Sequence, residues 1–260
     1  MKLEVLVSCM NQTDFSLAEK IGVKSDTLMV NQTDCCNYDE LSKGGYKIRM
    51  LSTVERGLSK SRNMAIDNSM GDICLLCDDD ELLENSYADT IINAFGRLPC
   101  ADIIAFEVKN RKKKLPNKII RIGYFRSLRI SSSQIAYKRD SIKNNNLKFD
   151  INLGAGTDNG VGEENKFLHD CLRNKLKIYY YPVEIASVTQ KKSTWFYGYN
   201  EKFFEDRGAS TRYIYGLGMS IIYGLYYIAV KRKKYINDIS TANAAIALFR
   251  GIILNRISHN

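Results

Sequence analysis

Strand-like apolar runs alternate with helix-like segments through the first half of this 260-residue chain, and this alternation restricts the fold more than any other feature. The predicted strands are Leu3–Cys9, Asp26–Val30, Tyr46–Leu51, Ile73–Cys77 and Asp102–Val108. The helices predicted among them are about Asp14–Lys20, Ser59–Met70 and Ser86–Phe95. Strands that alternate with helices are typical of a mainly parallel sheet with helices on both faces. The predicted class is therefore α/β.

The pattern continues with less regularity after Val108. Lys109 to about Ile130 is a basic segment, which we expect to be an exposed loop or a pair of edge strands. Glu163–Asn174 has acidic residues in its first turn and basic ones at its end, as suits a helix dipole. Lys177–Tyr181 and Glu184–Val188 are expected to be short strands.

Three consecutive aspartates, Asp78, Asp79 and Asp80, follow the apolar run Ile73–Cys77. Adjacent carboxylates repel one another, and a bound cation relieves that repulsion. Ligands of open α/β sheets bind at the carboxyl ends of strands, which is where these residues would lie. The motif alone leaves two interpretations open, a site for a divalent metal and a solvated acidic turn.

A second motif precedes the aspartates, at the start of the helix expected from Ser59. Lys60 and Arg62 fall in its first turn, where cations oppose the helix dipole unless an anion binds nearby. A phosphate group would satisfy both the cations and the helix N-terminus. Together the two motifs predict a pocket for a nucleoside diphosphate bridged by a divalent ion.

The order of these motifs resembles family 2 glycosyltransferases of the GT-A fold. The residues that carry the resemblance are the Ser59–Asn63 segment, Gly71-Asp72, the aspartate triplet and Gly162-Glu163-Glu164 with Phe167-Leu168. It covers about residues 1–205 and is closest to small bacterial enzymes of surface-polysaccharide assembly. It implies a Rossmann-like, mixed and mainly parallel sheet flanked by helices in a catalytic domain over residues 1–207. Residues 208–260 would form a C-terminal helical appendage.

The resemblance also implies roles for individual residues. Those expected to bind the nucleotide-sugar donor are Ser8, Cys9, Gln32, Asp34, Arg62, Asn63, Asp78 and Asp79. Asp80 is the first choice to bind Mn²⁺ or Mg²⁺, with Asp78 as the second metal ligand. Glu164 is the first choice for the catalytic base and Glu163 the alternative, because the family generally has Glu-Asp where this chain has two glutamates.

Acceptor recognition is assigned to two further regions. The glycine-rich stretch Gly154–Gly162 is either a loop that folds over the acceptor or a surface turn. Trp195 is either an aromatic platform for the acceptor or part of a core stripe with Tyr199 and Phe203. Processive members of the family carry Gln-x-x-Arg-Trp, and this chain lacks that arginine before Trp195. The departure favours transfer of a single sugar.

The net charge of +9 predicts an acidic partner. Part of this positive charge comes from the basic clusters Arg111–Lys114 and Lys231–Lys234. The eighteen residues Tyr213–Val230 carry no charge. They would form a packed helix, an interfacial membrane attachment or a membrane span. The seven cysteines form no regular framework, which suits reduced cytosol, so we expect a cytoplasmic protein on the cytoplasmic face of the membrane.

The preferred function is an inverting, metal-dependent glycosyltransferase. It would move one sugar from a nucleotide-sugar donor, UDP-linked by preference, to a lipid-linked or glycan acceptor in bacterial cell-surface polysaccharide biosynthesis. A nucleotidyltransferase is one alternative, but Ser8–Asn11 lacks the glycine-rich phosphate signature expected there. A non-enzymatic basic module that binds nucleic acid or anionic membrane is another, and it leaves the aspartates and glutamates without a role. The preferred interpretation includes no nucleic-acid partner.

Overall fold

The computed structural model describes residues 1–109, 115–157, 159–188 and 198–254. The chain divides into two compact units. The first comprises Met1–Phe149 and Phe167–Lys191, and the second comprises Asp150–Lys166 and Lys192–Asn260. Each unit is described separately below. The functional boundary predicted at residue 207 stays a prediction.

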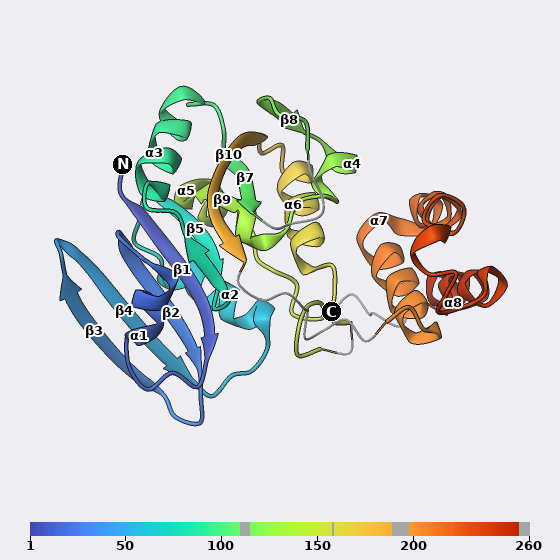
Figure 1. Cartoon of the computed structure of the whole chain (residues 1–260), viewed down its shortest axis with the longest axis horizontal. Helices are drawn as coiled ribbons and strands as arrows, with labels where there is room; N and C mark the ends of the chain where they lie inside the picture. Colours follow the sequence, from blue (N-terminus) through green and yellow to red (C-terminus); the bar gives the residue numbers. More distant parts are fainter. Residues whose placement is uncertain (110–114, 158, 189–197, 255–260) are drawn as a thin grey trace. The chain divides into compact units, whose positions relative to one another are not determined.

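The first unit is built on a ten-stranded sheet (Figure 1). Four neighbouring strands run parallel, in the order β4 (Tyr46–Thr53), β2 (Asp26–Gln32), β1 (Leu3–Met10) and β5 (Ile73–Asp78). The short β9 (Ile135–Lys138) lies antiparallel between β5 and β7 (Ile103–Lys109), and β7 pairs in parallel with β10 (Ile178–Val188). The remaining three strands pair antiparallel, namely β3 (Asn37–Lys43), β6 (Glu81–Leu83) and β8 (Ile120–Ile122). The predicted mixed, mainly parallel α/β sheet is confirmed.

Helices cover both faces of this sheet because its central strands are apolar on both sides. Val5 and Val7 of β1 belong to one buried core and Leu6 to the other, as the alternation of side chains along a strand requires. Helices α1 (Ser16–Ile21) and α3 (Tyr87–Arg97) contribute to the first core. Helices α2 (Leu58–Asn68), α5 (Arg139–Lys143) and α6 (Glu163–Arg173) contribute to the second.

Most predicted elements are present, and the differences have local causes. The two short strands expected after Lys177 are one strand, β10, whose pairing with β7 is irregular between Tyr180 and Glu184. Pro182 falls in this interval, where the missing ladder hydrogen bond of a proline is tolerated. Strand β3 escaped prediction because it is a largely exposed edge strand of mostly polar sequence.

The basic segment after Lys109 contains β8 and the short helix α4 (Tyr124–Ser127), and a 3₁₀ turn at Ser132–Gln134 follows it. Edge strand β8 pairs with the start of β10, so the edge-strand expectation is met in part of the segment. Arg111–Lys114 lie outside the described residues.

The second unit contains helices α7 (Glu201–Val230) and α8 (Thr241–Leu254), so the predicted C-terminal helical segment is present. Gly216 interrupts α7 with non-helical backbone angles, φ 75° and ψ 176°. We call Glu201–Tyr215 the first arm of α7 and Leu217–Val230 the second arm.

The two arms of α7 fold back on each other at Gly216. The Arg207 guanidinium donates a 2.8 Å hydrogen bond to the Tyr223 hydroxyl and lies 4.6 Å from the ring centre of Tyr227. In a straight helix, Arg207 and Tyr223 would be about 24 Å apart along the axis, which is beyond the reach of their side chains. The tyrosine-rich stretch is therefore half of a helical hairpin.

Helix α8 packs closely against both arms through glycines. A Cβ atom on Gly208 would lie 2.1 Å from the Leu248 carbonyl oxygen, and one on Gly251 would lie 2.0 Å from that of Glu205. In the second arm, Gly224 faces Leu248 in the same way, with a Cβ 2.7 Å from its Cδ2. A core of mainly aromatic and aliphatic side chains, including Phe204, Tyr227, Tyr235 and Leu248, fills the unit.

Candidate active site

The carboxyl ends of the parallel strands bring several predicted donor residues to one edge of the sheet. Ser8 near the end of β1 lies opposite Asp78 of β5 and Val30 of β2 in the strand registers. Gln32 ends β2 and lies opposite Met10. The first unit therefore gathers Ser8, Gln32 and Asp78 at the edge where open α/β sheets bind ligands.

Arg62 and Asp78 form an ion pair at this edge. The Arg62 guanidinium is buried and donates a 3.0 Å hydrogen bond to Asp78 Oδ1 and a 2.8 Å one to Ser132 Oγ. Ser132 Oγ in turn lies 3.4 Å from Asp78 Oδ2, and the guanidinium stands 5.3 Å from the ring centre of Phe149. The Asp78 side chain keeps 28% of its surface exposed. Arg62 and Ser132 therefore hold this carboxylate on its protein side, and its other side faces solvent.

Ser132 is a site residue that the sequence pattern does not predict. It lies in a short 3₁₀ turn after the basic segment, and the polar stretch Ser131–Gln134 resembles any loop. A capping box between Ser131 and Gln134 fixes the turn, and Gln134 Nε2 donates a 2.7 Å hydrogen bond to the Phe106 carbonyl of β7. The turn therefore brings Ser132 to Arg62 and Asp78 from a distant part of the chain.

Other residues at the start of α2 form hydrogen bonds with neighbouring segments of the first unit. Ser61 Oγ lies 3.0 Å from Ser8 Oγ, and the Gly57 amide donates a 2.7 Å hydrogen bond to Gln32 Oε1. The Asn63 side chain accepts from the Phe149 amide at 2.7 Å and donates to the Phe149 carbonyl at 2.8 Å. The resemblance assigned Arg62 and Asn63 to the donor, and their described partners are a carboxylate, a hydroxyl and a backbone segment.

Cys9 and Asp34 lie in contrasting surroundings. The Cys9 thiol is buried in the core and lies 3.6 Å from the Val30 carbonyl oxygen, so any donor contact would fall to its main chain. Burial, followed by the charge of Asp79, raises the pKa of this thiol to about 12. The Asp34 side chain is fully exposed apart from a 2.6 Å ion pair with Arg56, which also donates to the Thr33 carbonyl.

The acidic triplet fits a cation that arrives with its own oxygen ligands. Desolvation, followed by repulsion from Asp78 and Asp80, raises the pKa of the Asp79 carboxyl. Among the described residues, no group of three or more His, Cys, Asp or Glu side chains is arranged to hold a metal ion. A Mg²⁺-type ion is often held by one or two carboxylates together with substrate phosphates, and the triplet can supply that number.

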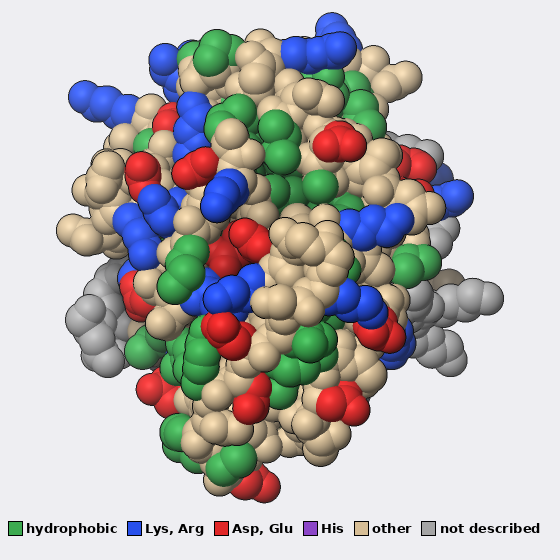
Figure 2. Space-filling model, turned by 90° about the vertical axis from the view of Figure 1, so that its left-hand side faces the viewer, with side chains coloured by type: hydrophobic (Ala, Val, Ile, Leu, Met, Phe, Trp, Pro, Cys, Tyr) green, Lys and Arg blue, Asp and Glu red, His purple; other side chains and the backbone are tan. Residues whose placement is uncertain are grey.

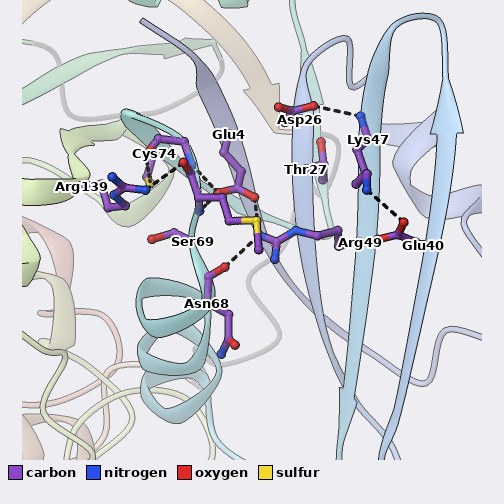
Figure 3. Close-up of polar contacts among 12 residues, drawn as sticks. Glu4, Asp26, Thr27, Glu40, Lys47, Arg49, Asn68, Ser69, Cys74 and Arg139 are labelled. Atoms are coloured by element: carbon purple, nitrogen blue, oxygen red, sulfur yellow. Dashed lines mark hydrogen bonds and ion pairs between the residues drawn. The ribbon is translucent and has the colours of Figure 1, made fainter.

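A buried ion pair inside the sheet fixes the turn that leads into β5 (Figure 3). Arg49 of β4 donates hydrogen bonds to Glu4 Oε1 at 2.6 Å and to the Asn68 carbonyl at 2.8 Å. Glu4 Oε2 accepts from the backbone amides of Met70 at 2.6 Å and Gly71 at 2.9 Å. A Cβ on Gly71 would lie 2.7 Å from Glu4 Cβ, which explains the glycine of the Gly-Asp pair. The network holds the end of α2 and the start of β5 together. Helix α2 carries Arg62, and strand β5 ends at Asp78.

The paired glutamates begin helix α6, whose first turn belongs to the second unit. Glu163 is buried and Glu164 is half-buried. Residues 150–162, called the polar stretch from here on, precede the glutamates, and their described part packs on the first arm of α7. The Tyr213 hydroxyl donates a 2.6 Å hydrogen bond to Asp150 Oδ2, and Ser210 Oγ lies 3.4 Å from the Val161 carbonyl oxygen.

Glycine is required at the end of this stretch. Gly162 has φ +103°, and a Cβ there would lie 3.3 Å from the Ile214 side chain. Leu153 is fully buried with Ala209, Tyr213 and Ile214. The described part of the stretch is thus anchored to α7, a partner that the sequence analysis did not identify. Trp195, the predicted acceptor platform, lies outside the described residues.

The surface around the sheet mixes both signs of charge. On the face drawn in Figure 2, Lys and Arg side chains alternate with Asp and Glu side chains over the described residues. A nucleic-acid-binding module is expected to gather its basic residues on one face. This face of the molecule does not show that arrangement.

One family model matches part of the chain. Residues 37–158 match the family model "Glycosyl transferase family 2". The predicted resemblance to family 2 glycosyltransferases is confirmed. The matched region contains β3, β4, α2, β5 and the acidic triplet. No curated protein matches the chain.

Several solved structures share the fold of this chain. S. aureus TarS 1-349 superposes with a TM-score of 0.56 at 14% identity, over 97% of this chain and 71% of TarS 1-349. The complex of TarS 1-349 with UDP-GlcNAc gives 0.57 at 15% identity, over 95% of this chain and 70% of that one. The mannosyltransferase PcManGT from Pyrobaculum calidifontis, in complex with GDP-Man and Mn²⁺, gives 0.54 at 10% identity, over 97% of this chain and 74% of that one. At these identities the similarity establishes the fold and not the substrates.

Proposed function

We propose that the protein is a metal-dependent, inverting glycosyltransferase that transfers one sugar from a nucleotide-sugar donor to an acceptor hydroxyl. The observation that carries the proposal is the Arg62–Asp78–Ser132 arrangement at the carboxyl end of β5, beside the carboxylates of Asp79 and Asp80. Support comes from the family match and from two similar structures whose names include UDP-GlcNAc and GDP-Man. A UDP-linked donor and an acceptor in bacterial cell-surface polysaccharide biosynthesis are part of the proposal.

The donor would lie against the ends of β1, β2 and β5. Asp78 is oriented by Arg62 and Ser132, so one side of its carboxylate is fixed toward the protein and the other stays available to ribose or sugar hydroxyls. Arg56 fixes Asp34 in the loop after β2, where the nucleotide base is proposed to bind. Ser61 and Gln32 fix the start of α2, and the N-terminus of a helix favours an anionic group.

Asp80 and Asp78 would hold Mn²⁺ or Mg²⁺, as the hard oxygen ligands that such ions prefer. A divalent ion at that place would stabilise the negative charge that develops on the departing diphosphate. Burial, followed by the charges of Asp78 and Asp80, raises the pKa of the Asp79 carboxyl, and a cation bound at the triplet would relieve that repulsion. The chain itself supplies the carboxylates and holds Asp78 in place.

An alcohol is a weak nucleophile at neutral pH, so transfer needs a group that removes its proton. We propose Glu164 for this role, with Glu163 as the alternative. Glu164 is half-buried and Glu163 is buried, so Glu164 is the more accessible carboxylate. A single base opposite the leaving group gives one displacement, and therefore inversion at the anomeric carbon. The absence of the processive arginine before Trp195 supports transfer of a single sugar.

The test is a donor screen followed by a product assay. Release of UDP or GDP from a panel of nucleotide sugars identifies the donor, and Mn²⁺ with that donor is expected to raise the melting temperature of the full chain. EDTA is expected to remove the shift. The proposal fails if no nucleoside diphosphate, with or without sugar, stabilises the protein in the presence of Mn²⁺ or Mg²⁺. A cytoplasmic location at the membrane is also part of the proposal.

A further inference from the structure

The second arm of α7, Leu217–Val230, exposes a continuous apolar stripe. Ile222, Leu225 and Val230 are each exposed by about 60%, and Tyr226 by 44%. With the exposed Ala229, these positions fall at helical spacings of three, four, seven and eight from Ile222, so they share one side of the helix. The opposite side is buried against the rest of the unit through Gly224 and Tyr227. The stripe is therefore not part of the packing among the described residues of the second unit.

The geometry of α7 argues against a helix that crosses a bilayer. By length and composition α7 is the one helix among the described residues that could do so. Its backbone breaks at Gly216, however, and Arg207 contacts both Tyr223 and Tyr227 across the break. The second arm alone has fourteen residues and is about 21 Å long, short of the roughly 30 Å hydrocarbon core of a bilayer.

Charge indicates what would cover the stripe. Lys231, Arg232, Lys233 and Lys234 follow Val230 directly, and the last three are exposed. The Lys231 ammonium lies 5.4 Å from the ring centre of the exposed Tyr226, so aromatic and basic groups meet at the end of the stripe. From Gly208 to Asn237 the sequence contains no Asp or Glu, and residues 208–260 hold seven basic residues against one acidic.

We infer that the second arm of α7 and the basic residues after it bind the surface of an anionic phospholipid bilayer, with the helix lying in the plane of the interface. Ile222, Leu225 and Val230 would enter the boundary between headgroups and acyl chains. Lys231–Lys234 would lie among the anionic headgroups, and Tyr226 would sit at the level between them. Apolar, aromatic and basic residues on one short helix are the features of an interfacial segment.

This arrangement would concentrate the protein on a surface where lipid-linked acceptors lie. The inference does not depend on glycosyl transfer, because it is tested by binding to vesicles without donor or acceptor. Loss of catalytic activity would leave it untouched. Failure to bind vesicles would likewise leave the proposed reaction untouched.

The experiment uses the full chain and sedimentation with vesicles of phosphatidylcholine, with or without about one third phosphatidylglycerol. The wild-type protein is expected to sediment with the anionic vesicles and to be released progressively by salt. Ile222→Glu combined with Leu225→Glu is expected to weaken this binding on the order of 100-fold, because two apolar side chains lose their burial. Neutralising Lys231, Lys233 and Lys234 with Gln is expected to cost a similar factor on anionic vesicles and little on neutral ones.

The control is Phe125→Glu in the first unit, where an even more exposed apolar residue (74%) is replaced by a single glutamate. It is expected to bind vesicles as the wild type does. Melting temperatures of all variants establish that the changes leave the fold intact. The inference is overturned if wild-type protein stays in solution with anionic vesicles at low salt, or if the α7 variants bind as tightly as the control. It is also overturned if the wild type is a dimer that the α7 double variant dissociates, since a second copy would then cover the stripe.

Discussion

The acidic triplet and the paired glutamates are held in different ways. Asp78 ends a central strand of the first unit and is fixed by Arg62 and Ser132, which come from two other segments of that unit. Glu163 and Glu164 start a helix whose first turn belongs to the second unit, after a polar stretch anchored to α7 by Tyr213. The donor side of the proposed reaction is therefore built into the sheet, and the proposed base depends on the C-terminal helices.

This difference suggests a division of labour. Substitutions in the Asp78 network should act on donor binding, whereas substitutions in the α7 anchor or the glutamates should act on turnover. Measurement of donor affinity and kcat on the same variant separates the two effects.

The largest effect is expected for Glu164→Gln. The amide keeps the shape of the side chain but cannot accept the proton of the acceptor, so kcat should fall by roughly 10²- to 10⁴-fold. Donor affinity, measured by calorimetry with Mn²⁺, should not change. Glu163→Gln is the matched variant one residue earlier. If it abolishes turnover while Glu164→Gln does not, the base is Glu163 and the assignment reverses.

Asp80→Ala tests the donor side, where a carboxylate of the acidic triplet is proposed to bind the metal. Loss of a metal-binding carboxylate is expected to weaken Mn²⁺-dependent donor binding by at least on the order of 100-fold. The weak binding that remains in EDTA should be the same in the variant and the wild type. Equal donor affinity of both proteins in Mn²⁺ would remove Asp80 from the metal site and leave the cation to Asp78 or Asp79.

Removing the Ser132 hydroxyl tests whether the Asp78 network serves the donor. Ser132→Ala deletes a 2.8 Å hydrogen bond to Arg62, worth about 1 kcal/mol, so donor affinity should fall by up to about 10-fold with kcat nearly constant. Ser127→Ala is the control, because it also removes a buried hydroxyl of the first unit, one bonded to the Tyr124 carbonyl. Similar changes in donor affinity for both variants would show a general loss of stability instead.

The grouping of Arg62 and Asp78 could be anticipated from the sequence because its parts are local in the chain. An apolar strand that ends in carboxylates, and a helix that starts just before it with Arg62, follow from strand and helix patterns within about twenty residues. Sheet topology then brings Ser8 and Gln32 to the same edge.

The remaining features depend on contacts between distant segments, which no local pattern records. Arg62 meets Ser132, which lies seventy residues further along the chain, and Tyr213 meets Asp150 across sixty-three residues. The apolar stretch Tyr213–Val230 was read as one segment because hydropathy does not show that Gly216 reverses the chain. Arg207, which packs against Tyr223 and Tyr227, stabilises that reversal.

Tyr213→Phe probes the anchor of the polar stretch on α7. The change removes the 2.6 Å hydrogen bond to Asp150 and keeps the buried ring, so we expect kcat to fall by a few-fold, in line with a loss of about 1 kcal/mol. Donor affinity should stay the same, because the anchor lies in the second unit. A fall in donor affinity with unchanged kcat would contradict the division between the units.

The smallest effect concerns the loop after β2, beside Asp34. Cys35 and Cys36 are exposed, as is Cys100, whereas Cys9, Cys74, Cys77 and Cys171 are buried. Alkylation needs the thiolate, and burial raises the pKa of both Cys9 and Cys74 to about 12, so at mildly alkaline pH these two should stay unmodified. Mass spectrometry should then find label on Cys35, Cys36 and Cys100 alone.

If the nucleotide base binds at this loop, donor with Mn²⁺ should slow the labelling of Cys35 and Cys36 by a few-fold while Cys100 reacts at its original rate. Cys100 follows α3 and serves as the internal control within the same molecule. Protection should disappear in Asp80→Ala, because that variant no longer holds the donor through its metal. Equal labelling with and without bound donor would place the base away from Asp34, and the donor side of the comparison would then consist of the Asp78 network alone.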